Sequence, residues 1–83
     1  MNYFVYMLKT IDKKHSKTYV GYTINLKKRL FLHNNKKGAK NTKGRKWKII
    51  YRKKFVNKID AMKYEYFLKK NKKLRNEIKL YKM

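Results

Sequence analysis

The chain has 83 residues, with 26 Lys and Arg against four Asp and Glu, so its net charge is +22. This length suits a single domain over residues 1–83, and a hydrophobic content of 42% is too high for a disordered basic tail. Because the chain has no Cys, disulfides, Cys-ligated zinc and thiol catalysis are excluded.

The excess of positive charge predicts a polyanionic partner. DNA or RNA fits better than an anionic membrane surface, because the basic residues are spread along the whole chain. No apolar run approaches the roughly 18 residues that a membrane-spanning helix needs, and the N-terminus has no signal-peptide pattern. We therefore expect a soluble intracellular protein without a membrane partner, in the cytoplasm or nucleoid, or in a nucleus.

Two strands are expected near the start of the chain. Residues 3–9 (YFVYMLK) form a nearly continuous apolar run, which is typical of a strand covered on both faces. After a polar stretch at 10–17, residues 18–23 (TYVGYT) favour a second strand. The two strands together predict an antiparallel hairpin with a rather long loop.

The register of this hairpin matters for two tyrosines. If Tyr6 pairs with Gly21, then Tyr19 lies opposite Leu8, and both tyrosines share one face of the sheet. Gly21 would leave room beside Tyr6 for a ligand to approach the backbone. The two phenols could then flank a phosphate, although each tyrosine taken singly is better explained as a sheet aromatic.

A helix is expected next in the chain. Asn25 is a suitable cap for a helix that begins at Leu26 and ends near residues 34–35. Its apolar positions would be Leu26, Leu30 and Phe31. The basic, Gly-containing segment that follows, residues 36–46, has no periodicity and predicts a surface loop.

The last third of the chain predicts one strand and two helices. Residues 47–56 (WKIIYRKKFV) favour a third strand, and Asn57 caps a helix over about residues 58–70. Asn71 can end that helix, and a short amphipathic helix then carries Leu74, Ile78 and Tyr81. The expected fold class is α+β, a small three-stranded, mostly antiparallel sheet flanked by helices in the order β-β-α-β-α-α.

Two residues of the first helix are candidates for phosphate chemistry. Arg29 and His33 are four residues apart, so they project from the same helix face. Only four arginines stand among the 26 basic residues, and the planar guanidinium binds phosphate in a bidentate way that lysine cannot. The alternatives are a solvated surface charge for Arg29 and a helix-dipole interaction for His33.

Glu65 is the acidic residue with an unusual setting. Ala61 and Leu68 lie about one helical turn away on either side, so Glu65 borders an apolar face. A partly buried carboxylate needs a cation, and three are available in principle: Lys69 at i+4, Arg29, or a Mg²⁺ shared with a phosphate.

The order of these residues along the chain is more informative than any one of them. The triplets Phe4-Val5-Tyr6 and Tyr19-Val20-Gly21 are followed by Arg29, by His33-Asn34 and by Glu65. This ordered set resembles the GIY-YIG nuclease family, with Phe4 in place of the first Gly. The resemblance covers nearly the whole chain and continues through the following stretches: Thr18–Thr23, Asn25-Leu26, Gly38-Ala39-Lys40, Thr42–Arg45, Trp47 and Ala61–Glu65.

The resemblance implies a metal-dependent endonuclease that hydrolyses DNA phosphodiester bonds. Glu65 would hold a single divalent cation, Mg²⁺ or Mn²⁺, and Arg29 would neutralise charge that grows in the transition state. Tyr6, Tyr19 or His33 would orient and deprotonate the attacking water. Of these three, His33 has the ordinary pKa best suited to a base near neutrality.

The chain is most similar to small stand-alone bacterial members of this family and to the nuclease domain of Slx1-type structure-specific endonucleases. That likeness implies a branched or otherwise structured DNA substrate, a possible protein scaffold partner, and roles in DNA repair or recombination. The loop before Trp47 would track the DNA backbone, while Trp47 itself belongs in the core or forms a stacking surface. The expected nucleic-acid contacts are Lys40, Lys43, Arg45, Lys46 and, on the last helix, Asn76, with Asn71 as its alternative.

Two other functions are consistent with the same residues. The first is a catalytically inactive nucleic-acid-binding module on the same fold, although binding alone would not need Glu65 among so many cations. The second is a basic protein associated with RNA or the ribosome.

Overall fold

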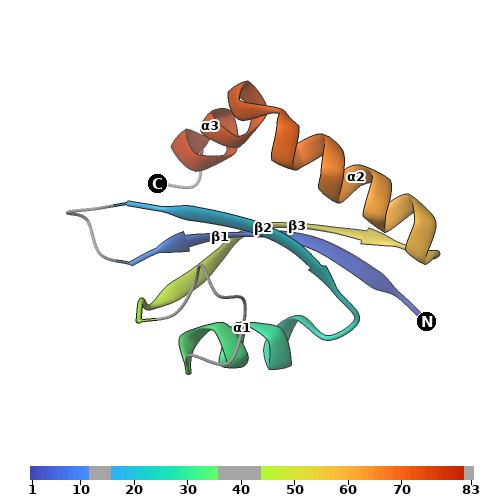
Figure 1. Cartoon of the computed structure of the whole chain (residues 1–83), viewed down its shortest axis with the longest axis horizontal. Helices are drawn as coiled ribbons and strands as arrows, with labels where there is room; N and C mark the ends of the chain where they lie inside the picture. Colours follow the sequence, from blue (N-terminus) through green and yellow to red (C-terminus); the bar gives the residue numbers. More distant parts are fainter. Residues whose placement is uncertain (12–15, 36–43, 82–83) are drawn as a thin grey trace.

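The structure, a computed structural model, describes residues 1–11, 16–35 and 44–81. Along these residues the elements are β1 (Tyr3–Thr10), β2 (Thr18–Thr23), α1 (Leu26–Asn34), β3 (Trp47–Phe55), α2 (Lys58–Lys70) and α3 (Lys72–Tyr81). The predicted order β-β-α-β-α-α and the α+β class are confirmed (Figure 1).

The sheet has the strand order β2-β1-β3, and both strand pairs are antiparallel. β1 is therefore the central strand, while β2 and β3 are the edges. The hairpin register meets the condition considered for the two tyrosines, with Tyr6 opposite Gly21 and Leu8 opposite Tyr19. The pairing of β1 with β3 shifts between Met7 and Leu8, which marks a bulge in the ladder.

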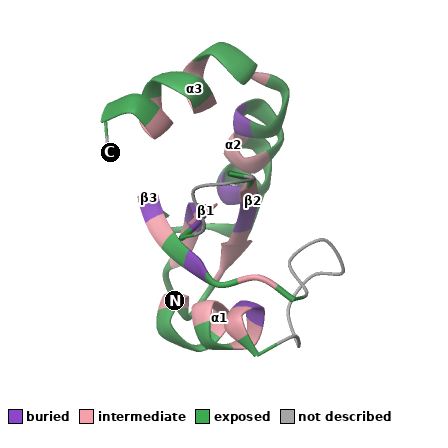
Figure 2. Ribbon diagram, turned by 90° about the vertical axis from the view of Figure 1, so that its left-hand side faces the viewer, coloured by how far each residue is buried: buried purple, intermediate pink, exposed green. Residues whose placement is uncertain are grey.

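Helices cover both faces of the sheet: α1 lies against one face, and α2 and α3 lie against the other (Figure 1). This layering explains why β1 is apolar along most of its length. Val5 and Met7 pack in the cluster that includes residues of α2, while Tyr6 and Leu8 pack in a second cluster with residues of α1. Figure 2 shows the buried residues concentrated between the layers.

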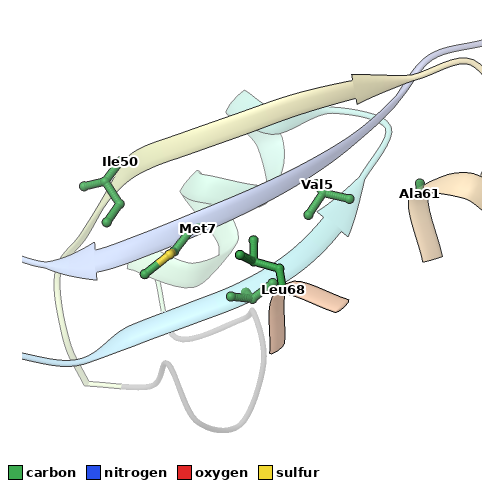
Figure 3. Close-up of a cluster of buried hydrophobic side chains, with 6 residues drawn as sticks. Val5, Met7, Ile50, Ala61 and Leu68 are labelled. Atoms are coloured by element: carbon green, nitrogen blue, oxygen red, sulfur yellow. The ribbon is translucent and has the colours of Figure 1, made fainter. Parts of the chain in front are cut away.

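The larger of the two cores lies between the sheet and α2. Its buried members come from β1, β2, β3 and α2: Val5, Met7, Val20, Ile50, Ala61 and Leu68 (Figure 3). The second core joins Tyr6, Leu8 and Trp47 beneath α1, and Trp47 is 2% exposed, so its assignment to the core is correct.

The prediction that Phe31 belongs to the apolar face of α1 is wrong. Leu26 and Leu30 pack against the second core, but Phe31 is 60% exposed. Five residues turn an α-helix by about 500°, so Phe31 lies well away from the direction of Leu26 and faces outward.

The helix caps follow the predicted pattern. The Asn25 side chain accepts a hydrogen bond from the Lys28 N–H at 3.0 Å, and the Asn57 side chain accepts one from the Asp60 N–H at 2.8 Å. Asn71 ends α2 and caps α3, since its Oδ1 accepts from the Leu74 N–H at 3.0 Å. Such caps each stabilise a helix by about 1 kcal/mol.

The third strand ends at Phe55, one residue earlier than predicted, and the first continues to Thr10. Among the helices that the structure describes, none combines the length and apolarity needed to cross a bilayer.

Candidate active site

Tyr6 is the centre of a hydrogen-bonded cluster between β1 and α1. Its side chain is 1% exposed, and its Oη lies 2.9 Å from Nε2 of His33. The Nε–H of Arg29 donates to the same Oη at 3.3 Å. The phenol oxygen thus accepts from Arg29 and shares a second hydrogen bond with His33, in which the donor depends on the imidazole tautomer.

Tyr19 completes this cluster from β2. Its ring centroid lies 5.0 Å from that of His33 and 6.4 Å from that of Tyr6. Unlike the other two rings, Tyr19 is partly exposed to solvent. We refer to Tyr6, Tyr19, Arg29 and His33 as the ring cluster.

Gly21 sits where the ring cluster meets the β2 backbone. A Cβ at position 21 would lie 2.6 Å from Oη of Tyr6 and 3.1 Å from Cε2 of Tyr19. No side chain fits at those distances, so the glycine is required for the two phenols to lie side by side. The room predicted beside Tyr6 for a ligand is instead occupied by the Tyr6 phenol, because that side chain folds back over its cross-strand neighbour.

Burial and charge alter the titration of the ring cluster. Burial raises the pKa of Tyr6 to about 12, although the Arg29 guanidinium opposes that shift. The hydrogen bond to Tyr6 raises the pKa of Arg29 above its ordinary value. Burial, assisted by the charge of Arg29, lowers the pKa of His33 to about 4. Near neutral pH the cluster therefore contains one cation, a protonated phenol and a neutral imidazole.

His33 differs from its predicted state. Its side chain is 0% exposed, and its pKa lies far below neutrality, so the expectation of a base with a near-neutral pKa is wrong. The cause is desolvation, which penalises the imidazolium form. His33 is hydrogen-bonded to Tyr6 and does not meet solvent.

Glu65 lies apart from the ring cluster, on α2 and thus against the opposite face of the sheet. Its side chain is 19% exposed, and its Oε1 lies 3.7 Å from Nζ of Lys69, one of the three cations expected for it. The charge of Glu65 nevertheless contributes to the raised pKa of Tyr6. This contribution is smaller than those of burial, Arg29 and Tyr19, and the ion pair of Glu65 is with Lys69.

The residues present fit a divalent cation with one protein ligand. Within residues 1–11, 16–35 and 44–81, no group of three or more His, Cys, Asp or Glu comes together. Mg²⁺ needs no such group, because one carboxylate, waters and phosphate oxygens complete its octahedron. Glu65 is partly exposed, and its partner Lys69 is a half-exposed side chain at 3.7 Å, so the carboxylate is open to a competing cation.

The predicted nucleic-acid contacts are only partly described. Lys40 and Lys43 lie outside the described residues. Arg45 is half-buried, and the exposed Lys46 reaches the Asn34 carbonyl, its Nζ lying 3.4 Å from that oxygen. Asn76 is exposed on α3.

Asn71 and Asn34 have structural contacts. Asn71 uses its side-chain oxygen to cap α3. Asn34 accepts from the Trp47 N–H at 2.6 Å and donates to the Trp47 carbonyl at 3.1 Å, which ties the end of α1 to the start of β3. This bridge gives the His33-Asn34 pair a shared role: His33 fastens α1 to β1, and Asn34 fastens it to β3.

Arg75 is a further candidate for phosphate binding. The sequence marked it only as one of four arginines. Its Nη1 donates to the Leu68 carbonyl at 2.9 Å and also to the Lys69 carbonyl, so it is anchored on the end of α2. With Tyr19 and Lys69 it lines a hollow of about 280 Å³. The link between Arg75 and the edge of β2 needs the packing of α3 and could not be read from spacing.

The chain matches the model of the GIY-YIG catalytic domain over residues 2–79. The chain therefore belongs to the GIY-YIG family, a family of nucleases.

More particularly, the chain is similar to small UPF0213 proteins. It is 46% identical over 68 residues to one from Oceanobacillus iheyensis, covering 81% of this chain and 76% of the relative. It is 48% identical over 71 residues to one from Clostridium perfringens, covering 84% and 72%. The solution structure of a UPF0213 protein from Bacillus halodurans superposes with a TM-score of 0.55 at 33% identity, covering 98% of this chain and 84% of that one. The likeness to Slx1-type endonucleases stays a prediction.

Proposed function

We propose that this protein is a metal-dependent endonuclease that hydrolyses DNA phosphodiester bonds, with branched or distorted DNA as its substrate. The proposal rests on one observation: hydrogen bonds join Tyr6 to both His33 and Arg29. Tyr19 lies beside these residues, and Glu65 lies across β2 from them. A module that only binds DNA would have no need for this buried polar arrangement, since surface lysines alone supply non-specific affinity.

Arg29 binds the phosphate in this mechanism. The hydrogen bond from its Nε to Tyr6 holds the guanidinium in one position, so the fork is organised before the substrate arrives. A preorganised cation stabilises negative charge that develops on the phosphate oxygens during attack, with no reorganisation at that moment. The raised pKa of Arg29 keeps it charged under all relevant conditions.

Tyr19 contacts the attacking water in this mechanism. Tyr6 is 1% exposed and His33 is 0% exposed, whereas Tyr19 is partly open to solvent. Tyr19 therefore orients the attacking water through its hydroxyl group, and only as a phenolate would it also take the proton of that water. Tyr6 and His33 act indirectly, since they hold Arg29 and the Tyr19 ring.

Glu65 is the residue that would hold the Mg²⁺ or Mn²⁺ ion. When bound, such an ion supplies Lewis-acid stabilisation of the phosphate and lowers the pKa of a coordinated water. The net charge of the whole chain, +22 on 83 residues, attracts the DNA backbone to this edge of the sheet.

A cleavage assay tests the proposal. The protein is incubated with Mg²⁺ or Mn²⁺ and labelled flaps, junctions, linear duplexes and single strands, with EDTA as a control. We expect cleavage of the branched substrates that EDTA abolishes. Arg29→Ala should lower the rate by about 10²- to 10³-fold. Arg52→Ala, which removes the same charge from an exposed position on β3, should leave it unchanged.

The alternative function predicts a different result. Metal-independent binding to the same DNA without turnover, equal for the parent and for Arg29→Ala, would identify a catalytically inactive binding module. Tighter binding to RNA than to DNA at matched salt would instead indicate an RNA-associated protein.

A further inference from the structure

Two basic hollows lie at opposite ends of the edge strand β2. The first, of about 280 Å³, is lined by Thr18, Tyr19 and Val20 at the start of the strand, together with Lys69 and Arg75. The second, of about 520 Å³, is lined at the end of the strand by Tyr22, Thr23 and Ile24 and includes Arg29 and Lys58. Gly21 lies between them, at the middle of the strand.

The position of α2 explains why a basic hollow lies at each end of β2. Lys58 begins α2 and lines the hollow at the end of β2, whereas Lys69, near the end of α2, lines the hollow at the start of β2. The helix therefore runs alongside the strand in the opposite direction. Glu65 lies between the two lysines in α2, about 6 Å along the helix axis from Lys69.

Each hollow contains one lysine and one fixed arginine. Arg29 is held by Tyr6, and Arg75 is held by the carbonyls of Leu68 and Lys69. Holding a guanidinium in place lowers the entropy lost when it binds an anion. Two of the four arginines of the chain are thus positioned at this edge, one on each side of Gly21.

We propose that the two hollows are phosphate subsites on either side of the scissile phosphate, so that one substrate strand lies along the outer edge of β2. This inference rests on the proposed nuclease function and adds the path of the strand. The flanking phosphate on one side is bound by Lys69 and Arg75, and the one on the other side by Lys58, whereas Arg29 at the same hollow binds the scissile phosphate. The scissile phosphate lies between them, on the side of the partly exposed Tyr19, with Glu65 on one face of the strand and the ring cluster on the other.

The first test measures binding without cleavage. Fluorescence anisotropy of a labelled flap oligonucleotide is recorded in EDTA over a series of salt concentrations. Arg75→Gln, Lys69→Gln and Lys58→Gln should each weaken binding by about tenfold and lower the slope of log K against log salt by about 1. Arg52→Gln, on the β3 edge, is the matched control and should change the slope by much less.

Arg75→Gln also removes the hydrogen bonds to α2, so its folding must be checked by thermal melting. Lys69→Gln avoids this problem, because Lys69 is half-exposed and its described side-chain pair is the one with Glu65. Equal slopes for all four variants would overturn the subsites, whether or not the protein cuts DNA.

The second test places the subsites on the substrate. Single methylphosphonate linkages, which remove one negative charge each, are introduced at successive positions around the cleaved bond. We expect one position to weaken binding of the parent by about tenfold but to have little effect on Arg75→Gln. A second position, on the other side of the cleaved bond, should behave in the same way with Lys58→Gln.

The outcomes separate the two proposals. Coupling of Arg75 and Lys58 to positions on the same side of the cleaved bond, or to no position, would overturn the proposed path while leaving the nuclease function intact. Absence of any cleavage would contradict the function, and the salt dependence would still decide the phosphate subsites.

Discussion

The two edges of the sheet differ in what they offer a ligand. The β3 edge has the larger groove, about 780 Å³, lined mainly by apolar side chains that include Ile49, Leu74 and Ile78. The β2 edge has two smaller hollows, with cations in both and the ring cluster between them. None of Tyr6, Tyr19, Arg29, His33 or Glu65 lines the larger groove.

The comparison shows that cavity size and altered pKa values are each insufficient to locate a site. The β3 side also has a perturbed group, since burial and a 2.6 Å hydrogen bond to Tyr64 raise the pKa of Tyr51. That pair involves two phenols stacked in the core and no acid. The β2 edge combines a fixed cation, a partly exposed ring and a carboxylate, and this combination is what phosphate hydrolysis needs.

The largest expected effect is on the cleavage rate, when a carboxylate is removed near the β2 edge rather than in the β3 groove. Glu65→Gln should lower cleavage by about a thousandfold or more, because it removes the proposed metal ligand. Glu77→Gln removes the same charge from the β3 groove and should leave cleavage unchanged. Single-turnover rates in Mg²⁺ measure both variants. Equal losses for the two would mean that the chemistry is not at the β2 edge.

The second prediction concerns the free energy of unfolding at acid pH. His33 has a pKa of about 4 in the folded protein and about 6.5 when unfolded, so only the unfolded chain takes up the proton between these values. The free energy of unfolding should therefore fall by up to about 3 kcal/mol as the pH is lowered from about 6.5 to 4. Urea denaturation at several pH values measures this, and His33→Gln should show a smaller decrease. A stability that does not change over this range would show that His33 is not desolvated.

The third prediction concerns the close contact at Gly21. Gly21→Ala should destabilise the protein by about 1–3 kcal/mol, because the new Cβ would lie 2.6 Å from the Tyr6 hydroxyl oxygen. Tyr6→Phe removes that oxygen but keeps Cζ, which would lie 2.9 Å from the new Cβ, so the double variant should lose slightly less than the sum of the single losses. Gly44→Ala is the contrast: it meets no atom within 4 Å and should cost about 1 kcal/mol from its φ of 80° alone. Additive losses at positions 6 and 21 would contradict the contact.

The smallest expected effect lies in the β3 groove. Ile78 is half-buried against the larger core, so Ile78→Ala should lower the free energy of unfolding by about 1–2 kcal/mol. The cleavage rate of the folded protein should not change. A cleavage rate that falls along with stability would indicate that the β3 groove takes part in substrate binding.

Much of the local structure was predictable because its causes are local. Asn25 and Asn57 cap helices through contacts three residues away, and both caps were visible as patterns, whereas Asn71 was expected only to end α2 and its capping of α3 was not predicted. The shared face of Tyr6 and Tyr19 was inferred on the condition that Tyr6 pairs with Gly21, and the structure meets this condition. The direction of Phe31 was missed, since one residue on a helix changes its facing by about 100°.

The candidate site was predictable only in part. The order of Tyr6, Tyr19, Arg29, His33 and Glu65 along the chain indicated a shared chemistry, and the roles of these residues remain proposals. Burial could not be read from spacing, and burial is what sets the pKa of His33 to about 4. Arg75 is bonded to the end of α2 and lines the hollow at the start of β2. This position also depends on how α3 folds back on α2.

The sequence alone determined the elements, the caps at Asn25 and Asn57, and the family, because these depend on short-range periodicity and on an ordered set of residues. The tertiary structure decided that β2 is an edge strand, that α2 runs beside it, and that His33 is enclosed while Tyr19 is open. The physical reason is that desolvation and the meeting of charges across a sheet edge depend on packing between distant segments, which no local pattern records.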